Sequence, residues 1–200
     1  PTFKGKIQFF PSEHWEKEFY LANKIGLKNM EWTLDYKNLF INPIFTNEGI
    51  KKIKHLSKKY SIKIKTLTGD CFMQKPFWKY KNSKKYIEDL KKIIKACGNL
   101  KIKYIIFPLV DKSSIKTKKE EKKIILKFKT LNNFLKKNNT KILFESDYTP
   151  DNLKEFIEKF NKENFGINYD SGNSASLNYD VNEEFNLYGT NHTNPDTEGD

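Results

Sequence analysis

The sequence predicts an α/β fold built on a parallel sheet, and two features of the chain support this prediction. A helical pattern and a short β-prone run follow one another five times, with the runs beginning near residues 28, 62, 102, 141 and 165. No hairpin signal interrupts this alternation, which specifies parallel strands joined by right-handed crossovers. Part of a (β/α)8 barrel satisfies the pattern. A doubly wound, flavodoxin-like sheet also satisfies it, although no glycine-rich phosphate loop is present.

The first half of the chain contains two of the repeats. Ser12 is a suitable N-cap for a first helix, and Gly26 supplies its stop. The strand that follows over 27–34 includes Glu31 and Trp32. The rest of this half is expected to form a helix over 47–60, a strand over 62–67 and a long aromatic loop over 68–78.

The second half continues the alternation. Gly98 is expected to end a helix over 82–97, and Thr117 with Glu120 forms the capping box of a helix that continues to Leu135. The other expected elements are strands over 102–110, 141–145 and 165–170, a helix starting at Pro150 after its N-cap Thr149, and a short helix over 182–187. The segment 190–200 is polar and turn-rich, which predicts a disordered tail.

Composition predicts a globular domain outside the membrane. The chain has 200 residues, 37% of them hydrophobic and 14% aromatic, which is enough for one core. Its longest apolar run, 104–110, is too short to cross a bilayer, and 1–10 lacks the layout of a signal peptide. Cys71 and Cys97 form neither a disulfide framework nor a zinc pattern. We therefore expect a cytoplasmic protein with reduced thiols.

The charge of the chain does not favour nucleic-acid binding. The formal net charge is +12, but all 37 basic residues are lysine, spread over the surfaces of the predicted helices. Base-specific contacts depend largely on the bidentate guanidinium group that lysine lacks. The composition therefore predicts a solvated, lysine-rich exterior.

Acidic residues end two consecutive strands. Glu145 closes the run 141–145 and Asp170 closes 165–170. Because the carboxyl ends of parallel strands meet at one edge, where ligands bind, we expect both carboxylates to point into one pocket. Glu31 lies near the end of its predicted strand and Asp70 directly follows another, so we expect both at the same edge of the sheet.

These further residues have structural alternatives. Glu31 would either bind substrate hydroxyls or pair with a lysine, and Asp70 would either face the pocket or lie in a solvated loop. Trp32 would either form a wall of the pocket, against which a sugar can pack, or belong to the core. Asn173 would either bind substrate or cap the turn at Gly172.

Several stretches together resemble one family. They are IQFFP at 7–11, GLKNMEW at 26–32, DCFM at 70–73, FPLVDKSS at 107–114, Glu145, and NYDSGNSASL at 168–177. Their order and spacing are similar to the xylose isomerase-like TIM-barrel superfamily, in its sugar phosphate isomerase/epimerase branch. The resemblance runs from about residue 7 to 189, which we expect to form one partial TIM-barrel domain.

The resemblance implies a metal-dependent proton transfer next to the carbonyl of a sugar or sugar phosphate. Glu145 matches the first metal ligand and a possible acid/base, and Asp170 matches the second ligand. The ion would be Mn²⁺, Mg²⁺, Co²⁺ or Zn²⁺, which polarises the carbonyl and stabilises an enediolate. Glu31, Trp32, Asp70 and Asn173 are the candidate substrate contacts.

The sequence also departs from the family pattern. It matches strands two to six of eight, and the strands with the third and fourth metal ligands are not recognised; His192 does not fit the missing histidine. We expect weak metal binding and two open sheet edges. Three explanations stay open: a fragmentary gene, a trimmed piece of a longer chain, or a half barrel that pairs with a second copy or a complementing chain. The alternatives are a non-catalytic remnant or binding module of the same fold, and an endonuclease-IV-like DNA repair nuclease, whose histidine-rich metal cluster three histidines do not supply.

Overall fold

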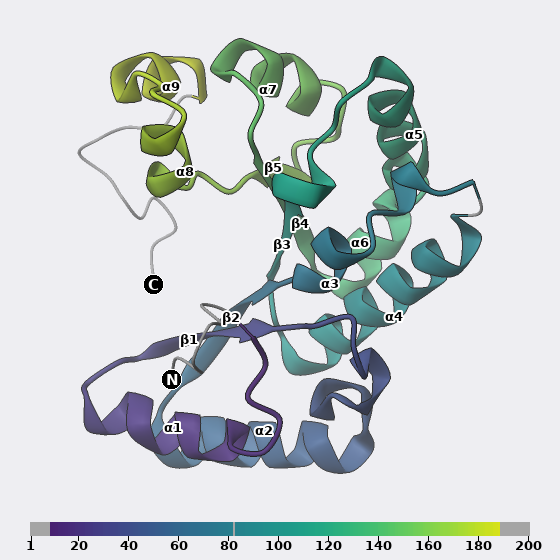
Figure 1. Cartoon of the computed structure of the whole chain (residues 1–200). Helices are drawn as coiled ribbons and strands as arrows, with labels where there is room; N and C mark the ends of the chain where they lie inside the picture. The colour runs from purple at the N-terminus through teal and green to yellow at the C-terminus, as the bar shows by residue number, and fades with distance from the viewer. Residues whose placement is uncertain (1–8, 82, 189–200) are drawn as a thin grey trace.

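One parallel sheet organises the chain. The computed structural model describes residues 9–81 and 83–188, and within them five strands pair in the order β1-β2-β3-β4-β5 (Figure 1). The strands are β1 Asn29–Thr33, β2 Lys63–Thr68, β3 Tyr104–Leu109, β4 Lys141–Ser146 and β5 Phe165–Ile167. Each of the five predicted runs overlaps one of these strands. The tail predicted over 190–200, with His192, lies outside the described residues.

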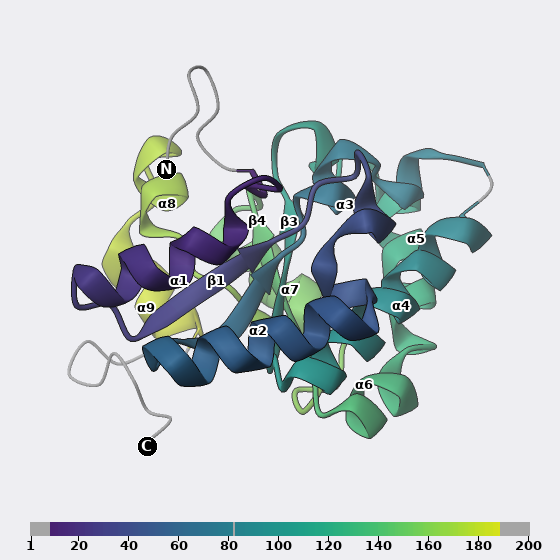
Figure 2. The same cartoon turned by 90° about the horizontal axis from the view of Figure 1, so that it is seen from below.

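Helices connect the strands. They are α1 Trp15–Lys24, α2 Asn47–Tyr60, α3 Asp70–Gln74, α4 Lys84–Leu100, α5 Lys118–Lys129, α6 Asn132–Asn138, α7 Pro150–Ile157, α8 Ser171–Ser176 and α9 Val181–Tyr188, with short 3-10 turns η1 Leu39–Ile41, η2 Pro43–Phe45, η3 Phe77–Lys79 and η4 Asp111–Ser113. The larger helices from α1 to α7 form an arc along one face of the sheet (Figure 1). Within the arc α1 packs on α2, α2 on α4, and α4 on α6 (Figure 2).

The strand order decides between the two architectures. A doubly wound sheet reverses its strand order at a switch point and carries helices on both faces. Here the order is sequential and the arc of helices covers one face. The flavodoxin-like alternative is therefore wrong. The fold is α/β with five parallel strands in one sheet, consistent with a partial TIM barrel.

Several helix starts follow the sequence rules. Thr46 Oγ1 accepts from the backbone N–H of Gly49 at 3.0 Å at the start of α2, and Thr117 Oγ1 accepts from that of Glu120 at 3.2 Å at the start of α5. Pro150 is the first residue of α7. Side-chain acceptors satisfy backbone donors that the first turn leaves without a partner, which explains why these starts were predictable.

Other boundaries differ from the prediction. The N-cap of α1 is His14, not Ser12. Gly98 lies inside α4, which ends at Leu100 because Lys101 adopts a left-handed conformation with φ 59°. A Cβ at Gly98 would lie 3.0 Å from the carbonyl oxygen of Asn138. Gly98 therefore permits the close approach of α4 to α6 rather than ending a helix.

Three expected segments are also subdivided. The helix predicted from 117 to 135 is two helices, because Thr130 Oγ1 donates to the Lys127 carbonyl at 2.7 Å and ends α5. The loop predicted over 68–78 contains α3, and the loop after Asp170 is the first turn of α8. The fifth strand ends at Ile167, three residues before Asp170.

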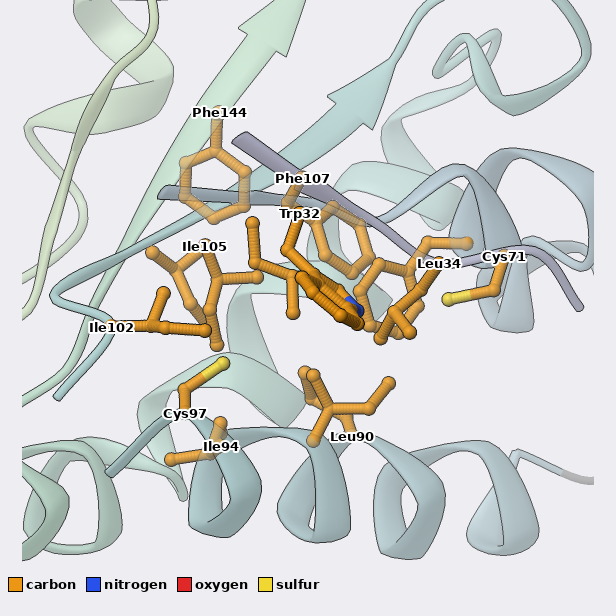
Figure 3. Close-up of a cluster of buried hydrophobic side chains, with 14 of the residues drawn as sticks. Trp32, Leu34, Cys71, Leu90, Ile94, Cys97, Ile102, Ile105, Phe107 and Phe144 are labelled. Atoms are coloured by element: carbon orange, nitrogen blue, oxygen red, sulfur yellow. The ribbon is translucent and has the colours of Figure 1, made fainter. Parts of the chain in front are cut away.

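The core lies between the sheet and the helices. The register places Trp32 beside Leu67 and Leu67 beside Ile105, and all three are buried. Figure 3 shows Trp32 and Ile105 in one cluster with Leu90 and Cys97 of α4. Because side chains alternate along a strand, the residues between these positions face the opposite side of the sheet.

Candidate functional site

Glu145 lies near the C-terminal end of β4, and two side-chain amides donate hydrogen bonds to its carboxylate. Its Oε2 accepts from Asn168 Nδ2 at 3.0 Å and its Oε1 accepts from Asn173 Nδ2 at 3.0 Å. The register that pairs Phe144 with Ile167 brings Asn168 beside Glu145. Each carboxylate oxygen therefore has a donor, and the half-buried side chain is fixed in orientation.

Asn173 joins Glu145 to Asp170. Asp170 is the exposed N-cap of α8, and its Oδ1 accepts from the backbone N–H of Asn173 at 3.0 Å. The side chain of the same Asn173 donates to Glu145. The structure thus connects the two predicted ligands through Asn173, which donates its backbone N–H to Asp170 and its side-chain amide to Glu145.

The short helix α8 is supported from α9. Glu184 is 3% exposed, and its carboxylate accepts from Ser174 Oγ at 2.8 Å and from Tyr169 Oη at 3.0 Å. A cavity of about 10 Å³, roughly the space of one water, lies between these residues and Glu145. The hydrogen bonds of Glu184 therefore connect α9 with the segment that holds the Glu145 amide donors.

The surroundings of Glu145 favour its protonated form. Burial raises the pKa of this carboxyl, the charges of Asp170 and Glu31 raise it further, and the hydrogen bonds from Asn168 and Asn173 oppose the shift. The net direction is upward. Glu145 therefore binds a proton more readily than an exposed glutamate does.

Two further acids lie at the edge near β1 and β2. Glu31 Oε1 accepts from Thr68 Oγ1 at 2.5 Å. Asp35, in the loop after β1, accepts from the backbone N–H of Phe10 and from Gln74 Nε2, each at 2.9 Å. Both carboxylates therefore have local donors, and Asp35 connects the loop after β1 to α3.

Asp70 differs from these neighbours. It is 7% exposed, and among the described residues no donor lies within hydrogen-bond distance of its carboxylate. Burial and then the charges of Asp35, Glu145 and Glu31 raise its pKa to about 7. The acids of β1, β2 and β4 are therefore close enough to influence one another across the edge.

Trp32 lies on the other side of the sheet from Glu31. It is 3% exposed, its ring centroid is 5.7 Å from that of Trp15, and Nε1 donates to Asn42 Oδ1 at 3.1 Å. The period of two along a strand explains why adjacent Glu31 and Trp32 cannot share a face. Trp32 belongs to the core, so we correct its assignment and leave it out of the candidate site.

Sequence reasoning gave no role to Asn168 or Asp35. The spacing contained a signal for both. Asp35 follows Glu31 by four residues, and Asn168 precedes Asp170 by two. Each predicted acid therefore has a second polar residue at an even distance along the chain, and residues at even distances on a strand share a face. Counting in twos from each strand-end acid would have selected them.

The described residues do not form a complete metal centre. Among them, no three His, Cys, Asp or Glu side chains are grouped so as to hold an ion. His14 caps α1 and His55 lies on α2, away from the strand ends. Glu145 and Asp170 supply oxygen atoms, but the Glu145 oxygens already accept hydrogen bonds from two amides. In the same residues, no helix is long and apolar enough to span a bilayer.

Comparison with known proteins agrees with the sheet topology. The family described as xylose isomerase-like TIM barrel matches residues 19–194. The chain belongs to this family. No curated protein matches the sequence of this xylose isomerase-like chain.

Solved structures share the fold of this family member at low sequence identity. D-psicose 3-epimerase with D-tagatose from Clostridium cellulolyticum H10 is 12% identical, with a TM-score of 0.72 over 88% of this chain and 64% of that one. A xylose isomerase-like TIM barrel protein from Mycobacterium smegmatis in complex with magnesium is 13% identical, with a TM-score of 0.68 over 90% and 63%. A sugar phosphate isomerase/epimerase from Parabacteroides distasonis ATCC 8503 is 13% identical, with a TM-score of 0.66 over 90% and 69%.

The length of the match limits what these structures show. The chain spans less than two thirds of the epimerase and of the magnesium complex. At 12–13% identity the likeness shows the xylose isomerase-like fold and no more.

Proposed function

We propose that the chain acts on a sugar, as an isomerase or epimerase that moves a proton at the carbon next to a carbonyl. The observation that supports this best is the state of Glu145. It is a half-buried carboxylate with a raised pKa, oriented by two amides at the edge of the sheet where barrel enzymes bind ligands. A raised pKa makes a carboxylate better suited to take up and return a proton near neutral pH.

Glu145 alternates between base and acid in this proposal. As a carboxylate it takes the proton, and the electron pair of the broken C–H bond moves to the carbonyl oxygen to give an enediolate. In an isomerisation the protonated side chain then gives the proton to the neighbouring carbon, while the hydroxyl proton of that carbon moves to the former carbonyl oxygen. In an epimerisation the same carbon receives a proton on its opposite face from a second acid or from water, and Glu145 releases its own proton to solvent. Asn168 and Asn173 keep the two oxygens in place, so little reorientation is needed between the two steps.

We propose that this chain binds a divalent ion only weakly. Glu145 and Asp170 are oxygen donors of the kind that Mg²⁺ and Mn²⁺ prefer. Two carboxylates are fewer than these ions usually require, and the described residues offer no third. We expect calorimetric titration with Mn²⁺ to give weak binding; tight one-to-one binding that Asp170→Asn abolishes would contradict this.

The family resemblance of the sequence allows a sugar phosphate as substrate, but the residues at this edge give no support for binding its phosphate group. Among the described residues, none of Glu31, Asp35, Asp70, Glu145 and Asp170 forms an ion pair with a lysine. The carboxylates of this edge would repel a phosphate group. The proposed substrate is therefore a sugar without a phosphate at this edge.

Proton exchange with solvent tests the proposal directly. The chain is incubated in D₂O with D-psicose, D-tagatose or D-fructose, with and without Mn²⁺, and deuterium at the carbons beside the carbonyl is measured by NMR. We expect exchange with at least one sugar and its loss in Glu145→Gln. Sugar binding without exchange in every condition would instead identify the non-catalytic alternative. Cleavage of an abasic-site duplex would identify the nuclease alternative.

Association and location are separate proposals. Among the described strands, β1 and β5 each have one neighbour, and an open parallel edge favours association with another chain. Sedimentation of the chain at several concentrations tests this. The free, buried thiols of Cys71 and Cys97 are compatible with a cytoplasmic location.

A further inference from the structure

The short helix α8 has no hydrophobic face to hold it in place. It spans Ser171–Ser176, and its one buried residue is the polar Ser174. Isolated helices of this length are unstable in water, and helices in proteins take most of their stability from the packing of an apolar face. The orientation of α8, and with it that of Asn173, therefore depends on polar contacts.

Glu184 makes the polar contact on the buried side of α8. This residue of α9 is 3% exposed, and each of its carboxylate oxygens accepts from one hydroxyl. Oε1 accepts from Ser174 Oγ at 2.8 Å, and Oε2 accepts from Tyr169 Oη at 3.0 Å. Since α9 packs against α7, Glu184 connects the segment 169–174 to the helices that cover the sheet (Figure 1).

Each amide donor of the candidate site is followed in the chain by a donor to the buried carboxylate of α9. Asn168 precedes Tyr169, and Asn173 precedes Ser174. The two asparagines each donate a side-chain amide to Glu145 at 3.0 Å. A displacement of either hydroxyl-bearing residue is therefore transmitted through one peptide bond to an amide that orients Glu145.

We propose that Glu184 is a positioning residue of the candidate site, which holds Asn168 and Asn173 where they donate to Glu145. Glu184 acts through its two hydroxyl partners. The cavity of about 10 Å³ that lies between it and Glu145 has room for about one water, so a sugar cannot reach it there. This inference rests on the proposed function in one respect, the role of Glu145 in proton transfer.

The side-chain amide signals of Asn168 and Asn173 test the inference without any substrate. They are observed by NMR of the ¹⁵N-labelled chain, and each is assigned by its absence from the spectrum of Asn168→Ala or Asn173→Ala. In Glu184→Ala we expect both amides to exchange with solvent about tenfold faster, since a hydrogen bond to a charged group contributes about that much. Glu183→Ala, at an exposed position of the same helix, is the matched control and should leave both rates unchanged.

Two milder variants test each contact separately. Tyr169→Phe and Ser174→Ala each delete one hydroxyl and keep Glu184, so the test does not depend on one variant folding. We expect Tyr169→Phe to accelerate mainly the exchange of the Asn168 amide, and Ser174→Ala mainly that of the Asn173 amide. Unchanged amide exchange in these two variants, with a native circular dichroism spectrum, would overturn the inference.

The conservative variant Glu184→Gln separates positioning from an effect of charge. The glutamine oxygen can accept from Tyr169 Oη, and its amide can donate to Ser174 Oγ, because a hydroxyl accepts as well as donates. We expect kcat for deuterium exchange into the sugar to fall about tenfold to a hundredfold in Glu184→Ala, with KM nearly unchanged, and to return to within about threefold in Glu184→Gln. An equal loss in both variants would overturn the inference, because the charge of Glu184 would then be responsible.

The outcomes separate this inference from the proposed function. If no sugar exchanges deuterium, the proposed function fails, whereas faster amide exchange in Glu184→Ala still supports the positioning role. Unchanged amide exchange in a folded Glu184→Ala chain would overturn the inference even if the sugar exchange is found.

Discussion

Carboxylate side chains have different surroundings in the two halves of one sheet edge, a donor-rich half beside β4 and β5 and a donor-free half at Asp70 beside β2. Beside β4 and β5, Glu145 and Asp170 receive hydrogen bonds from Asn168 and Asn173. Beside β2, Asp70 is more deeply buried and receives none from the described residues. Both Glu145 and Asp70 have raised pKa values, but for Glu145 two amides oppose the shift. Hydrogen-bond donors therefore oppose the effect of burial at Glu145, whereas at Asp70 burial and the neighbouring charges act in the same direction.

The largest expected effect comes from removing the acid/base group of the donor-rich half. Glu145→Gln keeps the size of the side chain but cannot exchange a proton. We expect deuterium exchange to fall by a factor of about a hundred to ten thousand, the usual contribution of a general base. The rate is measured in D₂O by NMR.

Structural integrity must be checked in the same variant. A glutamine at 145 can still accept one hydrogen bond from Asn168 or Asn173, so we expect its circular dichroism spectrum to match that of the unmodified chain. Undiminished exchange in a folded Glu145→Gln chain would show that another group moves the proton.

The next effect concerns the donor-free half and is one of stability. The pKa of Asp70 is about 7 in the folded chain, against 3.8 as its ordinary value. Between these values the folded chain binds a proton that the unfolded chain has released, so stability falls as pH rises through this range. Asp70→Asn removes the penalty. At pH 8 we expect it to raise the free energy of unfolding by up to about 4 kcal/mol.

The pH dependence distinguishes this cause from a packing effect. At about pH 4 Asp70 is protonated in the folded chain and close to half protonated in the unfolded chain, so the difference between the two chains should become small. Urea unfolding at pH 8 and pH 4 measures it. A gain of the same size at both values would mean that the carboxylate charge is not responsible.

The fold could be predicted because its signals are local. Alternating helical and β-prone runs located the five strands, and Thr46 and Thr117 behave as side-chain caps. The errors arose where distant contacts decide the outcome. Gly98 looked like a helix stop, but its function depends on the approach of Asn138 from α6. Contacts of that kind are not visible in a single run of sequence.

The location of the candidate site could be predicted from the sequence, but the hydrogen bonds within it could not. Parallel strands bring their carboxyl ends together, so the positions of Glu145 and Asp70 at one edge followed from the strand order. The amide contacts of Asn173 did not, because they depend on the rotamer of Glu145 and on the turn that begins α8. Trp32 was misplaced for a simpler reason, since strand alternation assigns it to the face opposite Glu31.

A smaller effect is expected from removing one donor in the donor-rich half. Asn173→Ala deletes the amide that donates to Glu145 but keeps the backbone N–H that donates to the N-cap Asp170. We expect a loss of about 1 kcal/mol of stability. Since this hydrogen bond lowers the pKa of Glu145, its loss should raise that pKa further. The acid limb of the exchange rate should then move to higher pH.

Control variants separate this role from a general effect on α8. Asn168→Ala should shift the acid limb in the same direction. Ser176→Ala removes only an exposed hydroxyl that donates to the Asn173 backbone carbonyl and keeps the Asn173 side-chain amide, so it should leave the acid limb unchanged. The pH dependence of deuterium exchange in the three variants is the measurement. A shift in Ser176→Ala equal to that in Asn173→Ala would point to a change in the helix rather than to the amide.

The smallest effect is expected at Glu31, whose one hydrogen bond within the described residues comes from Thr68. Thr68→Val keeps the shape of this buried residue and removes that donor. Because Glu31 is exposed, water can replace the hydroxyl, so we expect the free energy of unfolding to change by less than about 1 kcal/mol. A loss well above this value in urea unfolding would show that Glu31 depends on a protein donor as Glu145 does, and that exposure does not explain the difference between the two halves of the edge.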